Sequence, residues 1–90
     1  MDSRRKKELK ARAHAIKPVV LTGHAGLSEA VLAEIDRALD AHELIKVRLV
    51  AVDRDDCAAQ AQSICGTTSA ELVQIVGRVV TLFRKRRDAS

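Results

Sequence analysis

The chain has 90 residues, enough for one small domain with a single modest core. Its 47% hydrophobic and 31% charged residues are typical of a globular protein, and with one Phe and no Trp or Tyr the core must be aliphatic. No apolar run approaches the roughly 20 residues that span a bilayer, and the basic N-terminus lacks the apolar segment of a secretory signal. Cys57 and Cys65 form no CxxC pair, which argues against structural zinc and disulfides and favours a reducing cytoplasm.

Positive charge is concentrated at the two ends of the chain. The formal net charge is +4, yet residues 1–18 carry +5 and residues 78–90 carry +4, whereas residues 19–77 carry −5. Such asymmetry is typical of a surface that binds a polyanion, provided that the fold brings the two ends together. The alternative, that terminal Lys and Arg side chains only keep a small protein in solution, stays open at this point.

The first part of the chain predicts a helix followed by a strand. A helix is expected from a cap at Asp2 or Ser3 to about Ala15, with an apolar stripe on one face and basic residues on the other. Pro18 ends this helix because it restricts the residue before it to extended backbone. The apolar run Val19–Leu21 then predicts a short buried strand.

The middle of the chain predicts a helix followed by a half-buried strand. Ser28 is a good N-cap for the second helix, whose apolar residues recur at helical spacing. In the strand Leu44–Val52, every second side chain is apolar, and Lys46 and Arg48 point to the other side. Two neighbouring cations make that face unsuited to a helix layer, so we expect it to be open.

The last third predicts a third helix and a hairpin. The helix is expected from a cap at Asp53 to about Cys65, with Gly66 as its C-terminal stop. Two β-runs, Leu72–Val76 and Val79–Phe83, flank the turn at Gly77. The predicted order is α-β-α-β-α-β-β, an α/β fold of the two-layer α+β kind. It contains a four-stranded mixed sheet with the helices covering one face.

The loop between the first strand and the second helix contains two glycines three residues apart. Gly23 and Gly26 allow a tight turn and close approach by another molecule. Backbone N–H groups beside the positive end of a helix dipole are typical of phosphate sites. The loop is therefore a candidate clasp for a nucleic-acid backbone, although a GxxG pattern alone is more often an ordinary strand-to-helix turn.

No catalytic, metal or cofactor site is predicted. The segment His42–Lys46 begins like a zinc-protease sequence, but Lys46 stands where the second His is required. The cluster of Asp53, Asp55 and Asp56 is explained by the favourable position of carboxylates at a helix N-terminus. We therefore expect neither an enzyme nor a small-molecule substrate.

A longer pattern resembles a known family. The pattern consists of four segments in a fixed order and at fixed spacings: Leu9–His14, Lys17–Val20, the GxxG loop and His42–Val47. This pattern is similar to that of the CRM domain, named for chloroplast RNA splicing and ribosome maturation, in its stand-alone bacterial YhbY-like form. The resemblance covers roughly Lys7 to Arg84 and indicates one domain over residues 1–90, with a folded core at about 7–84 and basic terminal segments.

The resemblance implies a fold and a function. The implied fold is like that of the C-terminal domain of translation initiation factor three. The implied function is RNA binding, with ribosomal RNA in precursors of the large subunit as the partner, and we expect the protein to act as a monomer. The family's RNA contact is the GxxG loop, by likeness to KH domains, and it corresponds here to Gly23, His24, Ala25 and Gly26.

Flanking cations are expected to supply most of the charge. His24 is largely uncharged at neutral pH, so the loop itself would contribute backbone donors and shape. With so few aromatic residues, base-specific recognition should be weak and phosphate contacts should dominate. The expected phosphate ligands are Lys10, Arg12, Lys17, Arg84 and Lys85, with Arg86 and Arg87 further along the tail. Lys46 and Arg48 on the open sheet face are further candidates, and the alternative that they are only solvated cations on an exposed strand stays open.

A second function from another class also fits the sequence. The acidic middle of the chain could make the protein an interaction adaptor that docks on a ribosomal protein or assembly factor. The carboxylates that would form this surface are Asp36, Asp40, Asp53, Asp55 and Asp56.

Overall fold

The computed structural model describes residues 2–23 and 26–85. Over these ranges the chain follows the predicted order of elements. The helices are α1 (Ser3–Ala13), α2 (Glu29–His42) and α3 (Arg54–Thr68), and the strands are β1 (Val20–Leu21), β2 (Leu44–Arg48), β3 (Glu71–Val76) and β4 (Val79–Phe83). Within the described ranges, no helix has the length and apolar character needed to cross a membrane.

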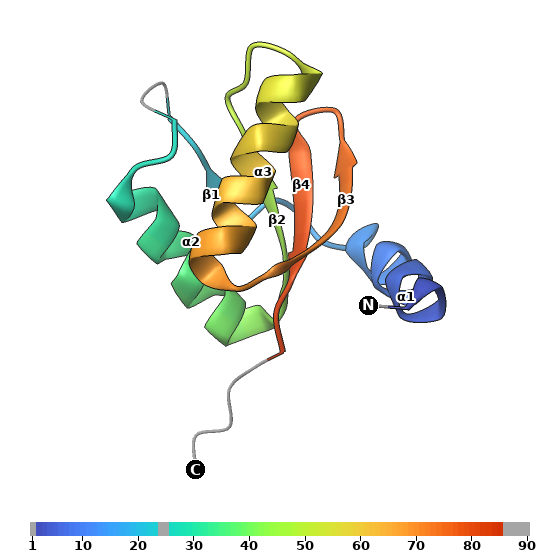
Figure 1. Ribbon diagram of the computed structural model, residues 1–90. Coiled ribbons are helices and arrows are strands. Elements are labelled where there is room, and N and C mark those ends of the chain that lie inside the picture. The colour runs from blue at the N-terminus through green and yellow to red at the C-terminus, as the bar shows by residue number, and fades with distance from the viewer. Residues whose placement is uncertain (1, 24–25, 86–90) are drawn as a thin grey trace.

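The four strands form one mixed sheet in the order β1-β2-β4-β3, as Figure 1 shows. β1 runs parallel to β2, and the other neighbours are antiparallel. β2 ends at Arg48, earlier than the predicted Val52, because the Thr22 side chain rather than a neighbouring strand accepts a hydrogen bond from the Val50 N–H. The mixed four-stranded sheet itself is confirmed.

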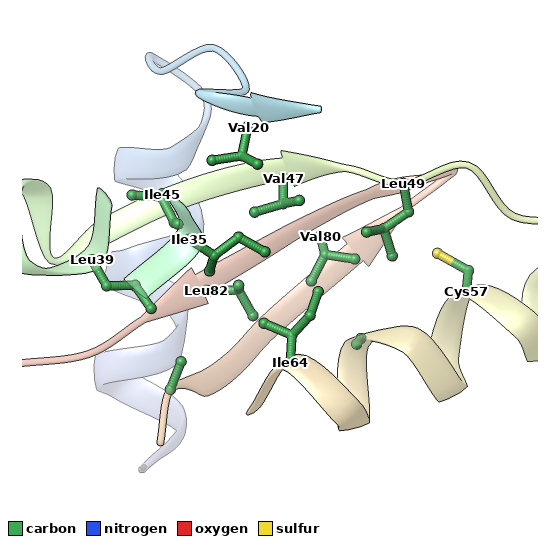
Figure 2. Packing of buried hydrophobic residues seen from close by; sticks show 12 residues of the cluster. Val20, Ile35, Leu39, Ile45, Val47, Leu49, Cys57, Ile64, Val80 and Leu82 are labelled. Atoms are coloured by element: carbon green, nitrogen blue, oxygen red, sulfur yellow. The ribbon is translucent and has the colours of Figure 1, made fainter. Parts of the chain in front are cut away.

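One face of the sheet packs against α2 and α3. Both helices begin at the predicted caps: Ser28 accepts a hydrogen bond from the N–H of Val31, and Asp53 accepts one from the N–H of Asp56. Aliphatic side chains from both helices meet those of the sheet, as Figure 2 shows. This larger core is made of Val20, Ile35, Leu39, Ile45, Val47, Leu49, Cys57, Ala61, Ile64, Ala70, Val80 and Leu82.

The third helix does not stop at Gly66, as the sequence predicted. It continues to Thr68, whose hydroxyl donates to the carbonyl of Ile64 at 2.7 Å. Ser69 then adopts the left-handed conformation that ends the helix, with φ of +61°. The glycine at 66 was therefore the wrong stop, because a serine three residues later takes the positive φ.

The first helix packs on the other face of the sheet. Leu9 is fully buried against Leu44 and Val73, with Ile16 and Phe83 packed around them. Figure 1 shows α1 set apart from α2 and α3. The sheet is thus buried on both faces at the end where β2 begins.

This position corrects two predictions. The helices were expected on one face, and the face of Lys46 and Arg48 was expected to be open along its whole length. Leu44 and Phe83 are paired across β2 and β4 and point to that same face, so they form an apolar end that α1 covers. Only the part around the two cations remains open.

A buried arginine joins β4 to both helices of the larger core. The guanidinium of Arg84 donates through Nη1 to Asp36 Oδ1 at 2.6 Å and to the Thr68 carbonyl at 2.7 Å. Nη2 donates to the Asp36 carbonyl and to Asp40 Oδ1, both at 2.9 Å. Burial alone would lower the pKa of Arg84, but the hydrogen bond to Asp36 and the charges of both carboxylates outweigh it and raise that pKa.

We expect the substitution Arg84→Ala to lower the free energy of unfolding by about 2–3 kcal/mol, because two backbone carbonyls and two carboxylates lose their donor. Arg84→Lys should recover part of this loss, since an ammonium keeps the charge but cannot make all four bonds. Urea unfolding monitored by circular dichroism measures both effects. The matched control is Arg37→Ala on the exposed side of α2, and an equal loss in the control would contradict the role given to Arg84.

Replacing Leu9 by alanine should cost about 2–4 kcal/mol of unfolding free energy, because it leaves a cavity under α1. The exposed Lys6 on the same helix provides the comparison, and Lys6→Ala should stay within about 0.5 kcal/mol of the original protein. Thermal and urea denaturation of the two variants test this. Equal stability of both would mean that α1 does not contribute to the core.

Candidate nucleic-acid interface

The glycine loop is a tight turn between the end of β1 and the cap of α2. The N–H of Gly26 donates to the carbonyl of Gly23 at 2.9 Å, which closes the turn. Gly26 has a φ of +73°, a conformation that favours glycine, whereas the φ of Gly23 is not positive. His24 and Ala25, predicted as RNA contacts, lie outside the described residues.

Both ends of the loop are anchored. On one side, the buried Thr22 donates its N–H to the Arg48 carbonyl at 3.0 Å, and its hydroxyl accepts from the Val50 N–H at 2.8 Å. On the other side, Ser28 caps α2 at 3.2 Å from the Val31 nitrogen. The loop therefore lies at the positive end of a 14-residue helix, where backbone N–H groups favour an anion.

Lys46 and Arg48 lie on the open part of the sheet, next to this loop. The pairing register sets Leu21 beside Arg48 on β1 and β2, and sets Lys46 beside Thr81 of β4. Arg48 is exposed and Lys46 is half-buried. A shallow hollow of about 300 Å³, formed where β1 and β2 end, is lined by Leu21, Thr22, Arg48, Leu49 and Val50.

Further cations lie on the first helix and on the segment that follows it. Arg12 and Lys17 line a hollow of about 450 Å³ that also includes Pro18. Pro18 in turn lines a smaller hollow, of about 220 Å³, with Lys46. Lys10 is half-buried on α1. Arg12 and Lys17 thus line a hollow that shares Pro18 with the hollow lined by Lys46, and their role as phosphate ligands beside Arg48 stays a prediction.

Two predicted ligands at the C-terminal end lie elsewhere. Arg84 is only 8% exposed and all of its bonds described above are internal, so its prediction as a phosphate ligand is corrected. Lys85 is exposed, but it follows Arg84, whose N–H donates to the Glu43 carbonyl just beyond the end of α2. The glycine loop lies at the start of that helix, about 20 Å away along its axis at 1.5 Å per residue. Arg86 and Arg87 lie outside the described residues.

The acidic residues of the adaptor hypothesis are mostly engaged within the fold. Asp36 and Asp40 bind Arg84. Asp53 caps α3, and Asp56 accepts hydrogen bonds from the Val52 N–H at 3.0 Å and from Gln60 at 3.2 Å. These carboxylates therefore serve stability, although the side chains of Asp36 and Asp40 remain 47% and 54% exposed.

Two observations concern metal-ligating groups and thiols in the described part of the chain. There, no group of three or more His, Cys, Asp or Glu residues could hold a metal ion. Cys57 is buried in the larger core, and burial raises the pKa of the Cys65 thiol, which keeps it protonated.

The sequence analysis missed two contributors to this surface. Leu21 is 65% exposed, although it belongs to a run that predicted a buried strand, and Val50 is 47% exposed in a run that predicted a half-buried one. Strand alternation was the available signal: Leu21 is the neighbour of the buried Val20, and Val50 continues the alternate row of Lys46 and Arg48.

Comparison with known proteins identifies the family. Residues 1–84 match the model of the CRS1 / YhbY (CRM) domain. The chain is 44% identical over 80 residues to a probable RNA-binding protein of Pseudomonas aeruginosa, covering 89% of this chain and 77% of the relative. It is 40% identical over 89 residues to an RNA-binding protein of Haemophilus influenzae, covering 99% and 90% of the two chains.

A solved structure agrees with the fold. The solution structure of a hypothetical protein of Staphylococcus aureus, for which RNA binding has been proposed, superposes with a TM-score of 0.86 at 30% identity. The match covers all of this chain and 94% of the other. With a family model spanning nearly its whole length and relatives of this similarity, the chain belongs to the CRS1 / YhbY (CRM) domain family.

Proposed function

We propose that this protein binds RNA through the glycine loop and the cations beside it, acting as a monomer and without catalysis. The observation that carries this function is the anchored loop of Gly23 and Gly26 directly beside the open sheet face of Lys46 and Arg48. The RNA-binding names of its relatives support it independently. The name of the domain, which includes ribosome maturation, supports ribosomal RNA in large-subunit precursors as the partner.

The loop and the cations would divide the work of binding. A phosphate on the loop would receive backbone N–H donors from the turn and from the first turn of α2, where the helix dipole favours negative charge. Arg48 would meet a neighbouring phosphate, and Lys46, Lys17 and Arg12 would meet others along the strand. Because the described surface here has no aromatic ring for stacking, affinity should depend on phosphate neutralisation and RNA shape.

A negative charge on the loop should abolish much of this binding. Gly23 has no positive φ and nothing within 4 Å of an added Cβ, so Gly23→Asp is expected to fold normally. Its carboxylate should repel phosphate and weaken RNA binding by roughly tenfold or more. Gly23→Ala should bind as the original protein does. Fluorescence anisotropy with ribosomal RNA fragments, and co-sedimentation with ribosomal precursors, measure the effect.

The control for this experiment is Gly66→Asp. Gly66 is exposed on α3 with equally open space, so the substitution changes net charge by the same amount away from the loop. If Gly23→Asp and Gly66→Asp bind RNA equally, the loop is not the contact. If RNA binding falls but association with precursors persists, the adaptor function is favoured instead.

Salt should weaken the complex steeply. Contact with about four to six phosphates predicts a log–log slope of affinity against salt of roughly −3 to −5. Arg48→Gln should make this slope shallower by about one, because one phosphate contact is lost. Arg54→Gln, an exposed cation on α3, should leave it unchanged. An affinity that is independent of salt would contradict phosphate-dominated binding.

A further inference from the structure

Exposed aliphatic side chains gather on the open face of the sheet. The described residues with large exposed apolar side chains are Val19, Leu21, Val50, Val52 and Val76. The pairing register puts Leu21 beside Arg48, and strand alternation puts Val19 on the same side. Val76 pairs with Val79, which itself pairs with Arg48 on this face. The cations of the open face are therefore set among aliphatic groups.

The segment that carries Val50 is fixed by hydrogen bonds from several elements. The Val50 N–H donates to Thr22, and its carbonyl accepts from Gln60 Nε2 at 2.9 Å. Arg78 Nε donates to the Ala51 carbonyl at 2.7 Å. With both backbone groups of Val50 satisfied inside the protein, only its side chain is offered to the surface. Such a surface is preorganised and loses little conformational freedom on binding.

Leu21, Arg48 and Val50 line the hollow of about 300 Å³ that adjoins the loop. Its lining combines aliphatic walls with one guanidinium, and Thr22, also in the lining, directly precedes Gly23. This combination matches a nucleotide, which has an apolar base face and an anionic phosphate. A second copy of this chain is a poorer occupant, because a symmetric contact would bring Arg48 and Lys46 against their own equivalents.

We propose that this hollow holds one unpaired nucleotide of the RNA strand that crosses the glycine loop. Its base packs against Leu21 and Val50, and its phosphate pairs with Arg48. Because this role presupposes RNA binding, it rests on the proposed function and deepens it by assigning single-stranded RNA as the ligand class. Aliphatic packing has no hydrogen-bond pattern to match, so any base is accepted.

The experiment separates base contacts from phosphate contacts. The probes are a uridine decamer and the same sugar–phosphate decamer without bases, and affinities are measured for each variant. The original protein should bind the base-bearing strand roughly three- to tenfold more tightly. Leu21→Thr/Val50→Thr should remove this ratio without changing affinity for the abasic strand, and Val50→Thr alone should reduce it in part. Threonine keeps strand propensity, and circular dichroism verifies the fold.

The matched control is Val76→Thr. Val76 is 63% exposed on the same face but on β3, at the opposite edge of the sheet from Leu21, so this change should leave the ratio intact. An unchanged ratio in the double variant, or an equal loss in the control, overturns the nucleotide site. Loss of self-association in the double variant would do the same by assigning the surface to a second copy.

RNA binding through the glycine loop can be tested separately from the nucleotide site. Gly23→Asp should lower affinity for both strands alike; if it lowers neither while the ratio still depends on Leu21 and Val50, the loop is not the phosphate contact and the hollow stands. If the original protein binds neither strand, both ideas are overturned.

Discussion

The position of the glycine loop depends on the two hydrogen bonds of Thr22. β1 has only two residues, too few for its ladder alone to hold the following loop in place. Thr22 extends the connection because its N–H donates to Arg48 and its hydroxyl accepts from Val50. The same residue therefore lies at the end of β2 and at the start of the loop. The glycine loop, the Arg48 guanidinium and the hollow are consequently held in fixed positions relative to one another. Separate surface loops would not be held in this way.

Much of the fold follows from local rules that act within a few residues. Alternating side chains predicted the core face of β2, and the hairpin turn appears at Gly77 with φ of +60°. Ser28 and Asp53 cap their helices as expected, because a short polar side chain before an apolar helical stripe has few other roles. The glycine loop was recognisable for the same reason: its spacing and its place before a cap are both local.

Two errors, the position of α1 and the role of Arg84, lie where distant segments meet. Which face α1 covers depends on Leu44, Val73 and Phe83 meeting across three strands, and no window of the sequence contains them all. Arg84 looked like part of a basic tail, yet the alternation of Val80 and Leu82 continues to it and directs it toward α2. There Asp36 and Asp40, one turn apart, face it. The alternation that buries Arg84 is visible in the sequence, but it can be interpreted only when the order of the strands is known.

The buried arginine also changes the meaning of the charge pattern. Charge at both ends of the chain suggested one basic surface assembled from the two termini. Arg84, however, is compensated by Asp36 and Asp40, so part of the acidic middle balances an internal cation instead of facing a partner. Lys85 follows at the far end of α2 from the loop. A basic face that includes the loop would therefore draw its cations from β2, from α1 and from the segment that follows α1. The exposed side chains of Leu21 and Val50 lie beside Arg48, and this combination suits a flexible polyanion whose bases also need cover from water.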